Sequence, residues 1–161
     1  MKRYVMLILT VVATMFYSCG NIDDCSVDVA IGTSAYIINN GLQEVSLSSL
    51  KNSTYQVHVY KSGYNGDKIK LDLAVADSLI TQYNAKNSTS YTLMPSQYYT
   101  VGSDGVSLST HHYRDSIPVT FNSSVASDAN YGTYLLPLVL TTAKESNLSV
   151  SYKGLLIHVS K

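Results

Sequence analysis

The carboxylates of this 161-residue chain are the first side chains to consider for chemistry, and their spacing argues against hydrolysis. Cleavage of a glycosidic bond needs two carboxyl groups about 5–9.5 Å apart in a cleft. Glu44 and Glu145 are the only glutamates, and most aspartates lie near the N-terminus or at predicted turns. Asp72 falls on the polar side of a predicted strand, with nothing to pair it with another carboxylate. The sequence therefore predicts that the chain is not an enzyme and has no catalytic residue.

The adjacent histidines His111 and His112 raise the question of a metal site. Neighbouring residues on a strand point to opposite faces, so both rings rarely bind one ion. No cysteine, glutamate or third histidine stands nearby in the sequence, and His58 and His158 alternate with apolar neighbours, which predicts outward strand positions. A phosphate loop and a nucleophile elbow are also missing. We expect no metal and no other cofactor.

Tyrosine is the residue type that remains for a binding surface. The chain has fourteen tyrosines and no tryptophan, and removing Tyr4 and Tyr17 with the N-terminal segment leaves twelve, more than a core requires. An exposed ring can stack on a sugar ring or a protein neighbour, and an amide can add hydrogen bonds. Tyrosine is also common on β surfaces through propensity alone, which remains the alternative. The predicted ligand-binding residues are Tyr98, Tyr99, Tyr131, Tyr134, Asn84 and Asn130.

The first eighteen residues are typical of a secretory signal peptide. A basic start is followed by an apolar run from Val5 to Phe16, which is shorter than the about 20 residues that span a bilayer. The segment 16–20 places Ser18 directly before Cys19 and resembles the lipobox of bacterial lipoproteins. The resemblance implies that Cys19 is linked to diacylglycerol and anchors the protein, with residues 19–27 as a tether. An ordinary signal peptide with a coincidental cysteine is the alternative.

The charge balance and the cysteine content limit the kinds of partner that the chain can bind. The eleven basic and eleven acidic side chains balance, so a basic face that could hold nucleic acid is not expected. Removing residues 1–18 takes away Lys2 and Arg3 and leaves nine basic against eleven acidic side chains. Acidic residues just after the cysteine, in the segment 21–24, resemble the signal that sends lipoproteins of gut anaerobes to the outer face of the outer membrane; a solvated spacer is the alternative. With Cys19 lipidated, Cys25 has no disulfide partner.

Alternating apolar and polar residues predict β-strands through the rest of the chain. One exception is Asp77, which precedes a helical pattern over 78–84 and is predicted to cap it. Gly-, Asn- and Ser-rich turns separate the strands. The pattern predicts one all-β domain over 28–161, an immunoglobulin-like β-sandwich with one short inserted helix. The predicted strands cover 55–60, 69–75, 106–108, 117–121, 134–140 and 148–160, the last with a bulge at Gly154.

Three short motifs carry a family resemblance. They are Tyr83-Asn84, the segment 91–99 with the pattern Y-x-L-x-P-x-x-Y, and the segment 134–138 with the sequence YLLPL. In this order they resemble the immunoglobulin-like domain of unknown function at the N-terminus of many surface lipoproteins of gut anaerobes, over about 27–160. The resemblance implies a role close to glycan capture and polysaccharide utilisation. Since the chain stops at Lys161, the activity of the module that usually follows is not expected here.

Residues within these motifs are predicted to shape the fold. Proline lacks a backbone donor, so Pro95 and Pro137 are expected at a strand edge or a bulge. The rings of Tyr83, Tyr91 and Tyr98 are expected to be buried, with their hydroxyls bonded at the rim of the sandwich.

Together these observations predict a non-catalytic outer-membrane lipoprotein that is exposed at the cell surface. Its expected partners are the membrane, through the lipid, and a polysaccharide, a partner lipoprotein or an outer-membrane transporter. The alternative is a structural fimbrial or assembly subunit that pairs with its neighbour through an edge strand.

Overall fold

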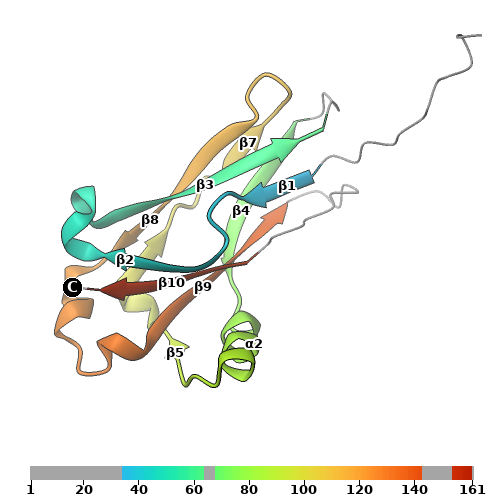
Figure 1. The fold of residues 1–161 in the computed structure, drawn as a ribbon. Coiled ribbons are helices and arrows are strands. Elements are labelled where there is room, and N and C mark those ends of the chain that lie inside the picture. Colours follow the sequence, from blue (N-terminus) through green and yellow to red (C-terminus); the bar gives the residue numbers. More distant parts are fainter. Residues whose placement is uncertain (1–33, 64–67, 143–153, 161) are drawn as a thin grey trace, which may run out of the picture. The chain divides into compact units, whose positions relative to one another are not determined.

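The computed structural model describes residues 34–63, 68–142 and 154–160 (Figure 1). The chain divides into the units 1–30 and 31–161, and all described residues belong to the second. The predicted signal peptide, Cys19 and the tether lie outside the described residues. Within the described part, no helix is long and apolar enough to cross a membrane.

Two β-sheets form the domain, which confirms the predicted all-β sandwich with one helix. Sheet A is antiparallel and has the order β1 (Ser34–Ile37), β3 (Thr54–Ser62), β8 (Arg114–Phe121) and β6 (Tyr99–Val101). Sheet B has the order β2 (Gly41–Ser46), β10 (Gly154–Ser160), β9 (Tyr134–Thr142), β4 (Ile69–Val75) and β7 (Val106–Leu108), and β5 (Thr92–Leu93) also pairs with β9. The pairs β2–β10 and β5–β9 are parallel.

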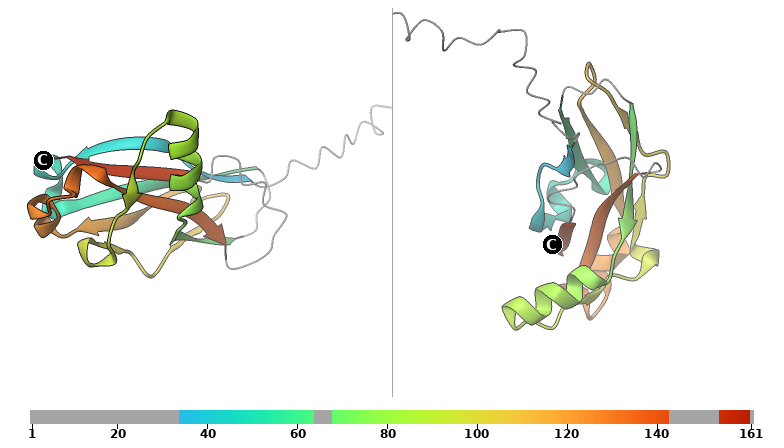
Figure 2. Two further views of the ribbon diagram at one scale, coloured as in Figure 1. Left: turned by 90° about the horizontal axis from the view of Figure 1, so that it is seen from below. Right: turned by 90° about the vertical axis from the view of Figure 1, so that its right-hand side faces the viewer.

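Helical turns connect the strands. The helix α2 (Ser78–Asn87) follows β4 and packs on the outer face of sheet B against β9 and β10 (Figure 2). Its Ile80 is buried with Leu135 and Leu156 in a small second core. Short 3-10 turns complete the connections: η2 (Leu47–Ser49), η3 (Lys51–Ser53), η4 (Ser96–Tyr98), η5 (Ser123–Ser127) and η6 (Tyr131–Thr133).

The main core lies between the two sheets and follows the predicted alternation. In β3, Val57 and Val59 face inward, and in β8 the inward residues are Ile117, Val119 and Phe121. Sheet B contributes a fully buried set from its two central strands: Leu136, Leu138, Leu155 and Ile157. Burial of these apolar side chains supplies the main driving force for folding, at about 25 cal/mol per Å² of apolar surface removed from water.

Several elements differ from the sequence prediction. The helix continues to Asn87, and Asp77 has helical backbone angles and makes no side-chain capping bond. The strands β1, β2, β5 and β6 were not predicted, because each is only two to six residues long and is surrounded by polar residues. The bulge expected at Gly154 falls at the first residue of β10, directly after residues outside the described part.

Pro137 lies in the central strand β9, which differs from the expected strand edge. The reason is that the neighbour of β9 changes at this point. The strand β4 ends opposite Leu138, β5 pairs as far as Leu135, and the carbonyl of Pro137 accepts a hydrogen bond from the amide of Ala76. The nitrogen of Pro137 faces the same gap between β4 and β5, where an amide donor would find no ladder partner. Pro95 lies outside the strands, directly before η4.

Candidate functional site

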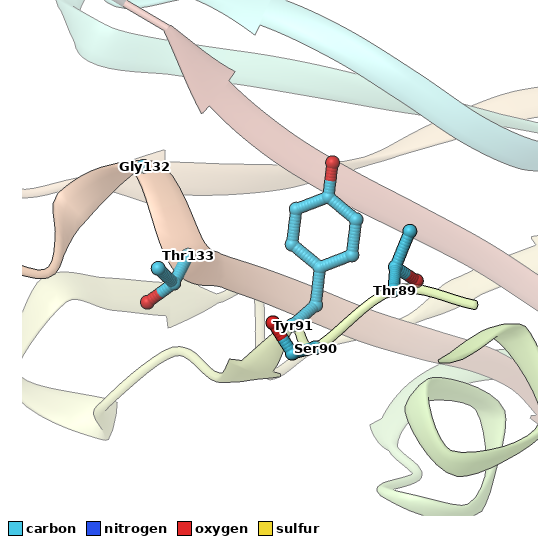
Figure 3. A pocket seen from close by; sticks show the side chains of 5 residues that line it. All are labelled: Thr89, Ser90, Tyr91, Gly132 and Thr133. Carbon is cyan, nitrogen blue, oxygen red and sulfur yellow. The ribbon is translucent and has the colours of Figure 1, made fainter. Parts of the chain in front are cut away.

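A small open pocket lies beside the end of β10, between the segment that follows α2 and the turn η6 (Figure 3). Its volume is about 240 Å³. The parallel pairing of β5 with β9 brings its two walls together, because Thr92 lies opposite Tyr134. Thr92 also bonds Thr133 through its side chain. The lining residues are Thr89, Ser90, Tyr91, Gly132 and Thr133.

The side chain of Asn84 holds one wall of this pocket. Its Nδ2 donates to the carbonyl of Tyr91 at 2.8 Å, and its Oδ1 accepts from the amide of Tyr91 at 3.0 Å and from the hydroxyl of Thr89 at 2.9 Å. The amide predicted to bind a ligand thus positions the wall from the end of α2. Its Nδ2 and its Oδ1 both bond the protein, so Asn84 shapes the pocket.

The ring of Tyr91 projects from this wall toward strand β10 (Figure 3). It packs against Tyr83, with ring centroids 6.0 Å apart, and in an edge-to-face arrangement with His158 at 5.4 Å. Contacts of this kind add to the energy of burial and fix the orientation of a ring. The rings of Tyr83 and Tyr91 pack against the second core but are only half-buried, which differs from the burial expected for them.

His158 connects the two walls to the strand β2. It lies on the outer face of sheet B, as its alternation predicts, and its Nδ1 is 2.6 Å from Oε2 of Glu44. Its Nε2 is 3.2 Å from the carbonyl oxygen of Gly132. Both ring nitrogens thus lie within hydrogen-bonding distance of an oxygen, which fixes the orientation of the imidazole ring. The Glu44 side chain is 57% exposed and leaves one oxygen open to solvent.

Tyr98 and Tyr134 lie in the main core and do not line the pocket. Each is only 9% exposed, and both hydroxyls donate to Oδ2 of Asp128, at 2.7 and 3.2 Å. The backbone amide of Asn130 donates to Oδ1 of the same carboxylate. These two rings belong to the core, which corrects the expectation that they offer a free face to a ligand. Tyr98 does bury its ring as predicted, although its hydroxyl bonds a side chain instead of the backbone.

The other predicted residues divide between the core and the pocket rim. Tyr99 is half-buried, and burial together with the charge of Asp77 raises the pKa of its hydroxyl. Tyr131 begins η6, directly before Gly132, and packs in part against the core. The carbonyl of Asn130 accepts a bond from the hydroxyl of Thr133. Of the predicted set, Tyr131 and Asn130 therefore flank the pocket through η6.

The Asp128 carboxylate makes the stability of this end of the sandwich dependent on pH. Bonds from the amide of Asn130 and the hydroxyl of Tyr98 hold the pKa of Asp128 below its ordinary value, and the bond to Asp128 raises the pKa of Tyr98. A carboxyl group with a lowered pKa stabilises the fold above about pH 4, and the contribution disappears as the pH falls through the folded-state pKa. We expect Asp128→Asn to be less stable than the wild type at pH 6, with the difference closing toward pH 2.

Urea unfolding midpoints at both pH values measure this difference. Asp104→Asn is the matched control, because it removes the same charge at an exposed turn. A constant gap between wild type and Asp128→Asn at both pH values would contradict the assignment.

The remaining candidates for chemistry lie apart from the pocket. His112 bonds Asp115 at 3.0 Å, and this bond, followed by the amide of Ser116, lowers the pKa of Asp115. Among the described residues, no group of three histidine, cysteine, aspartate or glutamate side chains is placed to hold a metal ion.

Sequence reasoning missed most of the pocket. Its hydroxyl residues and Gly132 belong to loops, and Glu44 and His158 are 114 positions apart in the chain. The motif Tyr83-Asn84 did indicate one wall of the pocket, since an asparagine near a helix end often bonds the backbone nearby.

Comparisons with known proteins agree with this fold. A family model of an N-terminal domain matches residues 26–147, more than half of the chain. A search of curated proteins finds no match. Among solved structures, a candidate carbohydrate-binding protein from Bacteroides ovatus has a TM-score of 0.63 and 23% identity over 80% of this chain and 37% of its own.

Two further structures contain a similar fold within longer chains. A two-domain protein of unknown function from Bacteroides fragilis has a TM-score of 0.62 and 15% identity, over 82% of this chain and 46% of its own. EndoBT-3987 of Bacteroides thetaiotamicron, solved with a Man5GlcNAc product, has a TM-score of 0.54 and 16% identity, over 74% of this chain and 28% of its own. This chain thus spans less than half the length of these three proteins. It belongs to the matched family of N-terminal domains, the immunoglobulin-like domain of unknown function of gut anaerobes that its motifs resemble.

Proposed function

We propose that this protein is a non-catalytic outer-membrane lipoprotein, exposed at the cell surface, that binds glycans through the Tyr91 pocket as an accessory to polysaccharide uptake. The observation that carries the proposal is the arrangement of an orientated aromatic ring beside hydroxyl side chains in an open pocket. Sugars present both an apolar C–H face and hydroxyl groups, and this pocket matches both.

The polar groups of the pocket include some that the fold does not use. Ser90 is exposed, and its hydroxyl bonds no described residue. The second oxygen of Glu44 and the hydroxyl of Tyr91 add an acceptor and a further donor nearby. The volume of about 240 Å³ is below the ~300–1,000 Å³ of pockets that enclose drug-sized ligands. We therefore expect the pocket to hold one or two sugar units at the end or along the side of a chain.

The solved relatives support the ligand class. One is a candidate carbohydrate-binding protein, and another was solved with a glycan product. Their identities to this chain are 23% and 16%, so the likeness shows a shared fold. The glycan as a ligand of this chain is part of the proposal. Anchoring at Cys19 would place the domain at the membrane, where a partner lipoprotein or transporter could receive the captured glycan.

Gly132 offers a direct test of the pocket. A Cβ atom at this position would meet no atom within 4 Å, and the residue has no left-handed backbone, so a larger side chain fits without disturbing the fold. It would occupy the pocket mouth instead. We expect Gly132→Leu to weaken glycan binding at least about tenfold, which corresponds to ~1.4 kcal/mol. Ser90→Ala should weaken it by less, since a hydroxyl contributes about 1 kcal/mol or less here.

The measurement is a glycan array followed by titration calorimetry with the best neutral ligand. Ser107→Leu is the matched control. Ser107 is exposed on β7, the edge strand at the opposite end of sheet B from β2, and the substitution introduces the same leucine side chain there. Absence of any glycan binding would overturn the proposed function. Undiminished binding by Gly132→Leu would remove the pocket as its site.

A further inference from the structure

The outer face of sheet A carries an aromatic group at one end. The register places Tyr36 of β1 opposite Tyr60 of β3, and Tyr60 opposite Arg114 of β8. Inward residues alternate with these positions: Ala35 and Ile37 are buried on one strand and Val59 on the next. Tyr36, Tyr60 and Arg114 therefore form a row across three strands on the outer face of sheet A. The helix α2 packs on sheet B (Figure 2).

Tyr113 completes this group by packing against the row from the segment before β8. The rings of Tyr36 and Tyr60 lie 5.1 Å apart, and Tyr113 meets Tyr60 edge-to-face at 5.4 Å. The amide of Lys61 donates to the carbonyl of Tyr113 and fixes the backbone at this point. Tyr113 is nevertheless 50% exposed. Tyr60 thus contacts the ring of Tyr113 and is itself backed by Tyr36, while much of the surface of Tyr113 faces solvent.

Arg114 adds a cation to the outer face of sheet A. Its side chain is exposed and forms no ion pair with any described residue. The next residue, Asp115, alternates to the other side of the strand and bonds His112 instead. Arg114, which lies opposite Tyr60 in the register, therefore has no carboxylate partner among the described residues, in a protein whose predicted mature form carries two more acidic than basic side chains.

We infer that the row of Tyr36, Tyr60 and Arg114, together with Tyr113, binds an acidic glycan. The ring of Tyr113 would receive the C–H face of a sugar unit, and Arg114 would bind a uronate carboxylate on the same or the next unit. Arginine is suited to this task because its planar guanidinium group binds a carboxylate through two parallel hydrogen bonds. The inference rests on the proposed function for the class of ligand, a glycan. The surface itself lies on sheet A, whereas the Tyr91 pocket lies on sheet B.

The test is titration of the full-length lipoprotein in detergent with polygalacturonate, and with highly methyl-esterified pectin as the neutral counterpart. We expect the wild type to prefer polygalacturonate and to lose affinity as salt is raised. Arg114→Gln should reduce the affinity for polygalacturonate about tenfold or more. Tyr113→Ala should reduce it about threefold or more, while Tyr113→Phe retains it, because the phenylalanine keeps the ring face.

A matched control separates this site from the general charge of the protein. Lys70→Gln removes a cation that is exposed on β4 of the other sheet. It should bind polygalacturonate as the wild type does, and equal urea midpoints would show that every variant is folded.

Each contrary outcome has a separate meaning. Wild-type affinity in Arg114→Gln, or an equal loss in Lys70→Gln, overturns the acidic-glycan site. Failure of the wild type to bind polygalacturonate overturns it too. In that case neutral glycan binding that Gly132→Leu abolishes would leave the proposed function intact.

Discussion

Replacing Cys19 with alanine is expected to move the protein from the membrane to the soluble fraction. The lipobox-like segment 16–20 implies two or three acyl chains on this residue, and each buried methylene contributes about 0.8 kcal/mol to membrane binding. A single chain gives only marginal binding, whereas two give a stable anchor. Among the helices that the structure describes, none has the length and apolar character to span a bilayer. Cell fractionation with detection of the protein in each fraction measures the change.

Cys25→Ala is the matched control for this prediction, since it removes the other thiol six residues further along the chain. It should remain in the membrane fraction, and mass spectrometry of the wild type should find an acylated N-terminal cysteine. A Cys19→Ala protein that stays in the membrane would contradict the anchor, as would a mature wild-type N-terminus at another residue.

The second large effect is expected in the core, from Leu136→Ala. Leu136 is fully buried in the central strand β9 and lies opposite the equally buried Ile157 of β10. The truncation removes apolar contacts from both strands and leaves a cavity, and such changes cost about 2–5 kcal/mol in the free energy of unfolding. Urea unfolding monitored by tyrosine fluorescence measures this loss, since the chain has no tryptophan.

Leu93→Ala makes the same chemical change on the neighbouring strand β5, where the side chain is 38% exposed. It should cost clearly less, about 1 kcal/mol or below, because much of its surface already meets water. Equal losses in the two variants would show that the packing of β9 differs from the structure described above.

Alternation along the chain was sufficient to predict the longer strands. Val57 and Val59 in β3 and Ile117 and Val119 in β8 are buried at every second position, as the sequence indicates. A strand with one polar face needs such a pattern wherever it is placed in a sheet. The short strands gave no comparable signal: β5 has two residues, and both are exposed at the side-chain level. The pairing of β5 depends on β9, which lies about 40 residues further along the chain.

In the candidate site, too, some properties follow from the residue type and others depend on residues that are distant in the sequence. The abundance of tyrosine indicates an aromatic surface, but it does not determine which rings are exposed. Tyr98 and Tyr134 are buried because Asp128 satisfies their hydroxyls from a different turn. Tyr113 packs against Tyr60, which in turn packs against Tyr36, and it remains 50% exposed. Residue type sets the chemistry of a side chain, and distant neighbours set its accessibility.

The sequence by itself determined the class of fold and the inserted helix, and it predicts the lipidation site at Cys19. Periodicity, turn residues and the N-terminal pattern are local properties of a chain. Only the tertiary structure decided where the two surfaces form. Glu44, Gly132 and His158 meet because β2 pairs in parallel with β10, and Tyr36 reaches Arg114 across β3. The physical reason is that the register between strands depends on the packing of the whole sandwich, which no single stretch of residues contains.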